Sequence, residues 1–237
     1  MLFEAKNLSK TFKTGWLKQK KVCAVSRAEI SLKRGETIGI VGESGAGKTT
    51  LGLMLTGLLK PDRCRDRYHI LFRGEEIWSL PRRRRRRYRR FIQIVFQNPE
   101  SVFNPRWKLR RSLFEPYRLH AIPFSENTIS EQLASVGLGT EMLSRHPSQV
   151  SGGELQRLAI ARVMSMNPAI VILDEPTSML DTITEGRIIR LLQDIQERSG
   201  VSYIFITHDL DLSRFFCDRI HELKEAVLTR ISYEEYI

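Results

Sequence analysis

The sequence predicts an α/β fold in which helices pack on a central, mostly parallel sheet. Three short apolar runs, at 36–41, 170–173 and 202–207, are typical of strands that are buried on both faces. Glycine or polar side chains follow each run, at the sheet edge where open α/β folds bind their ligands. The 237 residues suffice for one large α/β domain, or for a core with a small subdomain.

The first run leads into GESGAGKTT at 42–50, which fits the phosphate-loop pattern G-x-x-x-x-G-K-[ST]. Glycines let successive backbone N–H groups turn toward one anion. Lys48 would reach the β- and γ-phosphates of a nucleotide, and the Thr49 hydroxyl would ligate Mg²⁺. A helical period at 49–59 would place a helix N-terminus at the phosphates. A glycine-rich turn that binds nothing is the alternative, which the strand–loop–helix order disfavours. The predicted nucleotide-binding residues here are Gly42, Glu43, Ser44, Gly45, Ala46, Gly47, Lys48, Thr49 and Thr50.

Ionisable side chains follow the other two runs. Asp174 would hold Mg²⁺ through water, and Glu175 would be the general base or would polarise the attacking water. Two solvated carboxylates before a turn at Pro176 are the alternative. His208 could contact the γ-phosphate and hold the water and Glu175 in register, although a lone histidine is more often structural.

A second glycine pair precedes an amphipathic helix in VSGGELQRLAIARVM, at 150–164. Glycines ahead of a helix make an anion site, here formed by Ser151, Gly152 and Gly153. One nucleotide does not need two such sites in one chain. We therefore expect these three residues to contact a nucleotide that is bound to another subunit.

The composition favours a cytoplasmic protein whose membrane role, if any, depends on a partner. No apolar run approaches the ~20 residues that cross a bilayer, and the first ten residues lack the apolar core of a signal peptide. The cysteines, Cys23, Cys64 and Cys217, are scattered, which gives a zinc or iron–sulfur site no support.

Much of the net charge of +11 lies in RRRRRRYRR at 82–90. Ser79 can cap a helix that has Pro81 in its first turn. We interpret the run as a solvated helix, since charge runs usually are, with contact to anionic lipid headgroups as the alternative.

Together these segments resemble the ATP-binding subunit of an ABC transporter, over nearly the whole chain and in the order of that family. The resemblance identifies 42–49 as Walker A, Gln97 as the Q-loop glutamine, VSGGE as the signature, IVILDE as Walker B, SMLD at 178–181 as the D-loop and His208 as the switch histidine. It implies an ATP hydrolase that uses ATP and Mg²⁺. The implied catalytic residues are Glu175, His208 and Gln97, and the implied metal-site residues are Thr49, Gln97 and Asp174.

The same resemblance implies a RecA-like P-loop NTPase core with an antiparallel β edge and a helical subdomain. Residues 1–237 would form a single ABC ATPase domain. The core and its β edge would comprise 1–97 and 166–237, and the helical subdomain with the signature would comprise 98–165. Segments near Pro99, Pro105 and Pro116 would make the joint.

Family members stack an aromatic residue ahead of Walker A on adenine. Phe12 is our candidate and Trp16 its competitor, although both could simply cover the sheet edge. Two departures from the family pattern concern the signature, which has Glu154 for the commonest glutamine, and the last hairpin, where Lys224-Glu225 replaces the usual glycine turn.

A narrower resemblance lies in FQNPESVFNPRWKLRRSLFEP at 96–116, which is similar to ATPases of peptide and nickel importers. It implies an ATP-hydrolysing subunit that powers the import of peptides, nickel or a related small solute. The implied partners are a second ATPase subunit (a related chain or a second copy), two transmembrane permease subunits and, indirectly, an extracytoplasmic solute-binding protein. The chain would lie on the cytoplasmic face of the cell membrane, held there by the permeases.

Two other classes stay open from these residues. An ABC exporter ATPase shares every catalytic motif. A nucleic-acid-associated ATPase would use the arginine run. The roughly 100 residues between Walker A and the signature, however, contain no heptad array and so no long coiled coil of the kind that DNA-repair members of this superfamily insert there. We therefore expect no nucleic-acid partner. In the loop after Gln97, we expect Val102, Phe103 and Trp107 to form a permease docking surface or to pack inside the subdomain.

Overall fold

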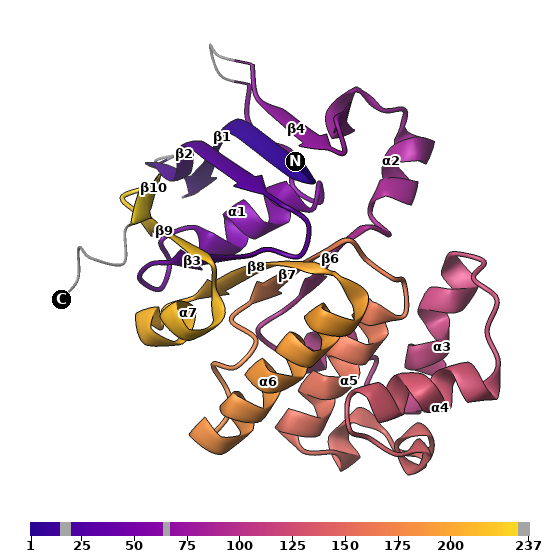
Figure 1. Ribbon diagram of the computed structural model, residues 1–237. Helices are drawn as coiled ribbons and strands as arrows, with labels where there is room; N and C mark the ends of the chain where they lie inside the picture. Colours follow the sequence, from indigo (N-terminus) through magenta and orange to yellow (C-terminus); the bar gives the residue numbers. More distant parts are fainter. Residues whose placement is uncertain (15–19, 64–66, 232–237) are drawn as a thin grey trace.

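The computed structural model describes residues 1–14, 20–63 and 67–231. The expectations for Trp16 and Cys64 therefore fall outside the described residues. The described part forms a ten-stranded sheet in the order β5-β4-β1-β2-β10-β9-β3-β8-β7-β6 (Figure 1). The strands are β1 (Phe3–Thr14), β2 (Lys20–Leu32), β3 (Thr37–Val41), β4 (His69–Phe72), β5 (Glu75–Glu76), β6 (Ile92–Val95), β7 (Ile170–Asp174), β8 (Ser202–Thr207), β9 (Arg219–Lys224) and β10 (Val227–Ile231).

The central strands are parallel, with β3 between β9 and β8, and β7 between β8 and β6. Every residue of β3, β7 and β8 is buried, because helices cover both faces of this part of the sheet. Ile170 and Ile172 of β7 face the cluster that contains helix α1 (Lys48–Leu55). Val171 and Leu173 face the cluster that contains α5 (Gly152–Met164) and α6 (Thr182–Ser199). The predicted α/β core is confirmed.

The predicted antiparallel edge is also confirmed. Strand β1 pairs antiparallel with both β2 and β4, and β4 pairs antiparallel with β5. One parallel pair, between Val227 of β10 and Ser26 of β2, joins this edge to the core. The hairpin from β9 to β10 turns without glycine, since Glu225 and Ala226 adopt φ values of 49° and 68°.

The chain between β6 and β7 is helical. It comprises η2 (Pro99–Val102), α3 (Leu109–Leu119), α4 (Glu126–Ser135), η3 (Thr140–Ser144), η4 (Pro147–Gln149) and α5. Ser125 caps α4 by accepting from the Thr128 N–H, and Ile129 and Leu133 of α4 are buried. The structure corrects one expectation here, because Pro116 lies inside α3 and not in a joint.

The docking role expected for Phe103 is wrong. Its side chain is only 4% exposed and belongs to the core cluster of the helical segment. Trp107 lies under the guanidinium of Arg111, which sits 3.7 Å from the ring centre. Val102 is half-buried and packs against the same cluster, while 104–106 are exposed.

The arginine run forms the helix α2 (Arg82–Tyr88), which follows the short helix η1 (Ile77–Ser79). Pro81 stands at the N-cap, and Ser79 does not cap α2, since its hydroxyl donates to the Glu76 carbonyl instead. Helix α7 (Leu210–Phe216) follows β8. None of the described helices is both long and apolar enough to span a bilayer.

Candidate functional site

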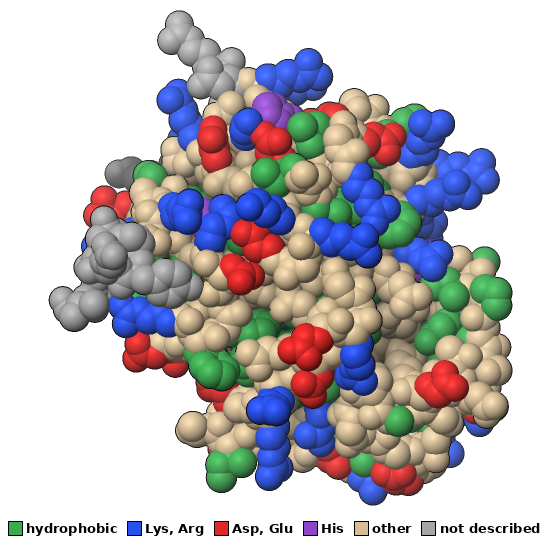
Figure 2. Space-filling view, in the orientation of Figure 1, with side chains coloured by type: hydrophobic (Ala, Val, Ile, Leu, Met, Phe, Trp, Pro, Cys, Tyr) green, Lys and Arg blue, Asp and Glu red, His purple; other side chains and the backbone are tan. Residues whose placement is uncertain are grey.

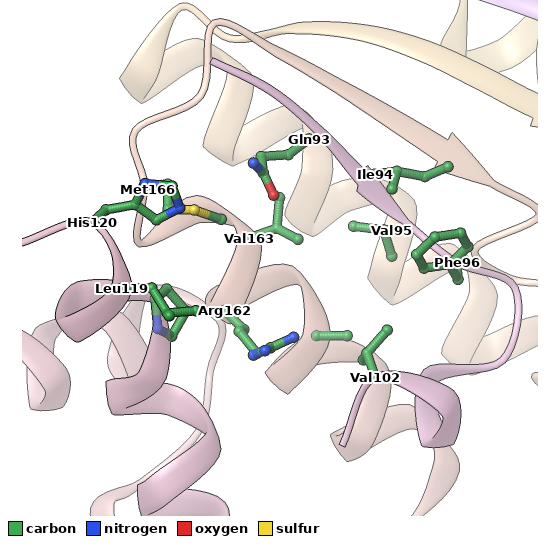
Figure 3. Close-up of a pocket in the computed structure, with 12 residues that line it drawn as sticks. Gln93, Ile94, Val95, Phe96, Val102, Leu119, His120, Arg162, Val163 and Met166 are labelled. Carbon is green, nitrogen blue, oxygen red and sulfur yellow. The ribbon is translucent and has the colours of Figure 1, made fainter. Parts of the chain in front are cut away.

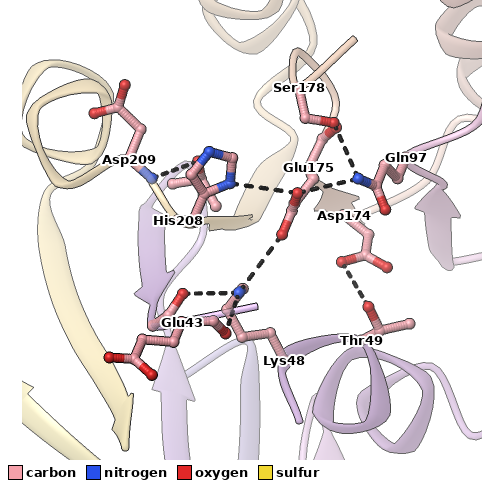
Figure 4. Close-up of polar contacts among 11 residues, drawn as sticks. Glu43, Lys48, Thr49, Gln97, Asp174, Glu175, Ser178, His208 and Asp209 are labelled. Carbon is pink, nitrogen blue, oxygen red and sulfur yellow. Dashed lines mark hydrogen bonds and ion pairs between the residues drawn. The ribbon is translucent and has the colours of Figure 1, made fainter. Parts of the chain in front are cut away.

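The carboxyl ends of β3, β7 and β8 bring the predicted catalytic side chains together (Figure 4). Lys48, at the start of α1, is 5% exposed. Its Nζ donates to the backbone carbonyls of Gly42 (2.8 Å) and Glu43 (2.9 Å), and it lies 3.5 Å from Oε1 of Glu175. The buried ammonium therefore ties the glycine loop to the end of β7.

Two loop glycines stand where the loop passes close to other backbone segments. Gly47 has a φ of 105°, and a Cβ there would lie 2.1 Å from the carbonyl oxygen of Ala24 in β2. A Cβ on Gly42 would lie 2.4 Å from the carbonyl oxygen of Leu223. The rest of the loop is exposed or half-buried, and it leads into the free N–H groups of the first turn of α1. These remaining positions are Glu43, Ser44, Gly45, Ala46 and, in α1 itself, Thr49 and Thr50.

A hydroxyl and a carboxylate meet beside the loop. Thr49 Oγ1 donates to Oδ1 of Asp174 at 3.2 Å, and Asp174 is 3% exposed. Burial, followed by the charge of Glu175, raises the pKa of the Asp174 carboxyl, while the Thr49 hydrogen bond and Lys48 oppose the shift. Hard oxygen donors of this kind fit Mg²⁺, which binds through one or two carboxylates and otherwise through water and phosphate. Within the described ranges, no three His, Cys, Asp or Glu side chains gather at one point to hold a metal alone.

Glu175 stands in a strained position at the centre of the cluster. Its φ of 47° is left-handed, which costs a non-glycine residue on the order of 1 kcal/mol or more. Its N–H donates to the Ile206 carbonyl at 2.9 Å, so neighbouring β8 holds the turn in place. The side chain is 14% exposed, and its Oε2 accepts from Gln97 Nε2 at 3.2 Å.

Gln97, which follows the edge strand β6, contacts both Glu175 and Ser178. Its Nε2 also donates to Oγ of Ser178 at 3.2 Å, and that hydroxyl donates in turn to the Glu175 carbonyl at 3.2 Å. Among the described contacts, none joins Gln97 to Thr49 or Asp174. Sequence reasoning placed Ser178 in a motif but missed this bond, because the residue spacing carries no signal for it.

His208 approaches Glu175 from the end of β8. Its Nδ1 lies 3.4 Å from Oε2 of Glu175, and its side chain is 56% exposed. The Asp209 N–H donates to Thr207 Oγ1 at 3.0 Å, and Asp209 caps α7 by accepting from the Leu212 N–H. These bonds fix the turn that carries the imidazole (Figure 4).

The second glycine site lies apart from this cluster. Ser151 caps α5, and its N–H and Oγ both donate to Oε2 of Glu154, at 2.7 and 2.8 Å. The backbone bond from Ser151, followed by its side-chain bond, lowers the pKa of the Glu154 carboxyl. No hydrogen bond or ion pair in the described part of the chain links 151–153 to the glycine loop. A cavity of about 190 Å³ instead lies between Gln97 and Gly152.

Phe12 lies at the antiparallel edge, where its side chain is 39% exposed. It pairs with Val22 of β2, two residues before Ala24, whose carbonyl faces Gly47. The ring is therefore available near the glycine loop. Lys10 Nζ stands 5.8 Å from its centre.

Replacing Asp174 by Asn should stabilise the ligand-free protein. A carboxyl whose pKa is raised by folding opposes folding once it ionises, so the penalty is absent well below its ordinary pKa of 3.8, grows as the pH rises past that value and is complete above the raised pKa. Asn can still accept from Thr49. We expect the melting temperature of Asp174→Asn to exceed that of the wild type at pH 8, with the difference narrowing as the pH falls and closing below about pH 3. Glu131→Gln, at an exposed site on α4, is the control. An equal or lower melting temperature at pH 8 would contradict the account.

Comparison with known proteins assigns these segments to one family. The model of the family described as "ABC transporter" matches residues 25–178. The oligopeptide transport ATP-binding protein AppF of Bacillus subtilis (strain 168) is 41% identical over 203 residues, which cover 84% of this chain and 60% of AppF. The nickel import ATP-binding protein NikE of Escherichia coli (strain K12) is 41% identical over 199 residues, which cover 83% of this chain and 73% of NikE. The chain thus spans less than two thirds of the length of AppF.

Solved structures share the fold. The ATP-binding cassette MJ0796, in a dimeric post-hydrolysis state bound to ADP and Pi, superposes with a TM-score of 0.84 at 28% identity, covering 99% of this chain and 100% of that one. CbiO1 of Clostridium perfringens, part of the ABC transporter complex CbiONQ, gives a TM-score of 0.78 at 28% identity, covering 96% of this chain and 86% of its own. The glycine loop, the strand-end carboxylates and the helical segment between them are thus the parts of an ATP-binding cassette, and the chain belongs to the ABC transporter family.

Proposed function

We propose that this chain binds and hydrolyses ATP to power an importer of peptides, nickel or a related small solute. The observation that carries the proposal is the convergence of Lys48, Glu175 and the Thr49–Asp174 pair at one sheet edge. The relatives named for oligopeptide transport and nickel import support import over export and over nucleic-acid work.

The glycine loop would hold the phosphates of ATP. Its N–H groups and the helix N-terminus favour an anion, and Lys48 would exchange its carbonyl partners for phosphate oxygens. Phe12 would stack on adenine. Mg²⁺ would be held by the Thr49 hydroxyl and, through water, by Asp174, with Gln97 reaching it after a shift. When bound, Mg²⁺ neutralises charge on the β- and γ-phosphates.

Glu175 would act as the general base. A water molecule attacks the γ-phosphorus, the bond to the β-phosphate oxygen breaks, and ADP leaves while the water proton passes to the carboxylate. His208 and Gln97, which approach Oε2 of Glu175 from two sides, would orient that carboxylate and the water. The Glu175 side chain is 14% exposed, which limits the access of bulk water to its carboxylate.

A second ATPase subunit would complete the site. No contact in the described part of the chain joins Ser151, Gly152 or Gly153 to the glycine loop, and we propose that these residues contact the γ-phosphate on an opposing subunit. The Ser151 hydroxyl, which now donates to Glu154, would then change its acceptor. The dimeric state of the MJ0796 cassette supports such a partner. A related chain or a second copy could fill this role.

An apolar cavity marks our proposed docking site for a permease (Figure 3). It has a volume of about 230 Å³ and lies between the edge strand β6, η2, α3 and α5. Val95, Val102 and Met166 line it, and Leu119 at its rim is 63% exposed. Strand β6 runs directly into Gln97, so a helix seated in this cavity could shift the glutamine relative to Glu175.

We further propose that residues 98–165 move as the helical signature subdomain against the core formed by 1–97 and 166–237. Two permeases would hold the chain at the cytoplasmic face of the cell membrane, and an extracytoplasmic binding protein would deliver the solute to them. The proposed permease contact at β6 and the proposed subunit contact at Ser151 would both lie on or beside this helical segment, which is consistent with its proposed role as the moving part.

Replacing Glu175 by Gln should abolish turnover and spare ATP binding. The carboxylate acts in the transition state, while Lys48 and the loop also bind the ground state. We expect phosphate release to fall by about a hundredfold or more, with ATP affinity close to that of the wild type. The mutant should accumulate as an ATP-bound dimer in size-exclusion chromatography. Turnover near the wild-type value would remove Glu175 from the mechanism.

Replacing Ser151 by Arg should block the assembled pair. The larger cation fills the space proposed for the opposing γ-phosphate, so turnover of the assembled transporter should fall about tenfold or more. ATP binding by the isolated chain should persist, because its own loop is untouched. Ser199→Arg, at the exposed end of α6, is the control. Unchanged turnover in a folded Ser151→Arg variant means that no composite site exists.

Replacing Leu119 by Asp should weaken permease binding. A carboxylate at the rim of the apolar cavity would be desolvated by a docked helix, which costs on the order of a few kcal/mol. We expect less permease to co-purify, with ATP binding by the isolated chain unchanged. Phe215→Asp, at a 71% exposed position on α7, is the matched control. Normal co-purification and solute uptake with Leu119→Asp would place the docking site elsewhere.

A further inference from the structure

We propose that helix α2 is a binding surface for the phosphate groups of anionic membrane lipids. The helix consists of six consecutive arginines and one tyrosine, and two more arginines follow it. The proposed ATPase function leaves this feature unexplained, because no contact in the described part of the chain joins these arginines to Lys48, Asp174 or Glu175. We call the exposed arginines of this helix the α2 surface, which comprises Arg82, Arg83, Arg84, Arg86 and Arg87.

The helix divides its residues between an anchored face and an open face. Arg85 and Tyr88, three positions apart, share the inner side. The Tyr88 ring is 5% exposed and meets Phe72 edge-on with centres 4.8 Å apart, and the Arg85 guanidinium lies 4.9 Å from the Trp78 ring centre. All five arginines of the α2 surface are exposed. The aromatic anchor thus fixes the helix and presents the five guanidiniums outward.

Carboxylates do not compensate this charge. No ion pair within the described ranges involves any arginine of 82–90, and the first turn of α2 contains no acidic residue. Glu76, on the neighbouring segment, accepts instead from the N–H groups of Ile70 and Trp78. Like charges one helical turn apart repel, and cations at a helix N-terminus oppose its dipole. A row of unpaired arginines therefore costs stability and is complementary to an extended anionic surface.

The position of the helix fits a membrane beside a permease. Arg90, two residues after α2, donates its Nε–H to the Met166 carbonyl at 3.3 Å, and Met166 lines the cavity proposed for the permease helix. Lys and Arg side chains also gather along the rim of the molecule above the helical segment in the space-filling view (Figure 2). A chain docked to a permease through this cavity would hold α2 close to the bilayer.

Lipid phosphates fit the α2 surface better than a nucleic acid or an acidic protein loop. The five arginines cover a wide arc of the helix, which suits a diffuse array of anions more than one complementary loop. Single-stranded nucleic acid requires exposed aromatic rings for stacking, and Tyr88, the aromatic residue of this helix, is buried. A polybasic cluster of four to eight side chains is also the size that binds anionic lipid surfaces.

The test is co-sedimentation of the purified 237-residue chain with vesicles. We expect binding to vesicles of phosphatidylcholine with phosphatidylglycerol, weak binding to phosphatidylcholine alone, and loss of binding at high salt. Each basic side chain near an anionic surface strengthens binding about fivefold. Arg83→Gln with Arg86→Gln should therefore weaken binding about twenty-five-fold. Glycerol phosphate in solution should not compete, because a single phosphate lacks the array.

Two matched variants make the result specific. Arg187→Gln with Arg190→Gln removes the same charge from exposed positions on α6 and should bind as the wild type does. Arg83→Lys with Arg86→Lys keeps the charge and should also bind, whereas docking to carboxylates through paired guanidinium bonds would be lost. Equal binding to both vesicle types, wild-type binding by the α2 Gln variant, or loss of binding in the Lys variant would each overturn the proposal. Neither ATP nor permease takes part, so failure here leaves the proposed ATPase function standing.

Discussion

A buried ammonium group joins the two halves of the nucleotide site. Lys48 is almost inaccessible, and its charge is balanced by two loop carbonyls and by Glu175. A charge in such a position is stable only with good partners, so the loop must keep the shape that supplies them. Gly47 permits that shape, because the loop crosses the Ala24 carbonyl at a distance that no side chain allows. The same ammonium group would become available to phosphate once a nucleotide supplies better oxygens.

Glu175 connects this local arrangement to the segments that follow β6 and β8. Its left-handed backbone is held by β8, while its carboxylate is shared between Lys48, Gln97 and His208. Side chains from three segments that are far apart in the chain therefore contact the Glu175 carboxylate. A shift of β6 or of the loop after it would change the Gln97 contact first. Under the proposed function, movement of a docked permease would reach the Glu175 carboxylate through this bond.

Much of the fold could be predicted because strands that are buried on both faces appear in the sequence as short, continuous apolar runs. The runs at 36–41, 170–173 and 202–207 became β3, β7 and β8, with their polar neighbours at one edge. Contacts inside a loop could not be predicted in this way. Phe103 is an apolar residue in a proline-rich loop, a sequence context that does not predict burial. Its burial follows from the packing of α3 and α5 around it. The Ser178 bond to Gln97 depends on a turn geometry that no spacing encodes. The helix start at Arg82, against the expected Ser79 cap, reflects competition from the Glu76 carbonyl.

We propose above all that this one sheet edge binds ATP with Mg²⁺ and cleaves it. Binding of ATP to the wild-type chain and release of inorganic phosphate should be measured in the same preparation, with and without Mg²⁺, over a range of protein concentrations. We predict tighter binding with Mg²⁺, and phosphate release that requires Mg²⁺ and rises more steeply than protein concentration as subunits pair. Tight ATP binding without any phosphate release, even in membranes that contain the assembled transporter, would contradict the account.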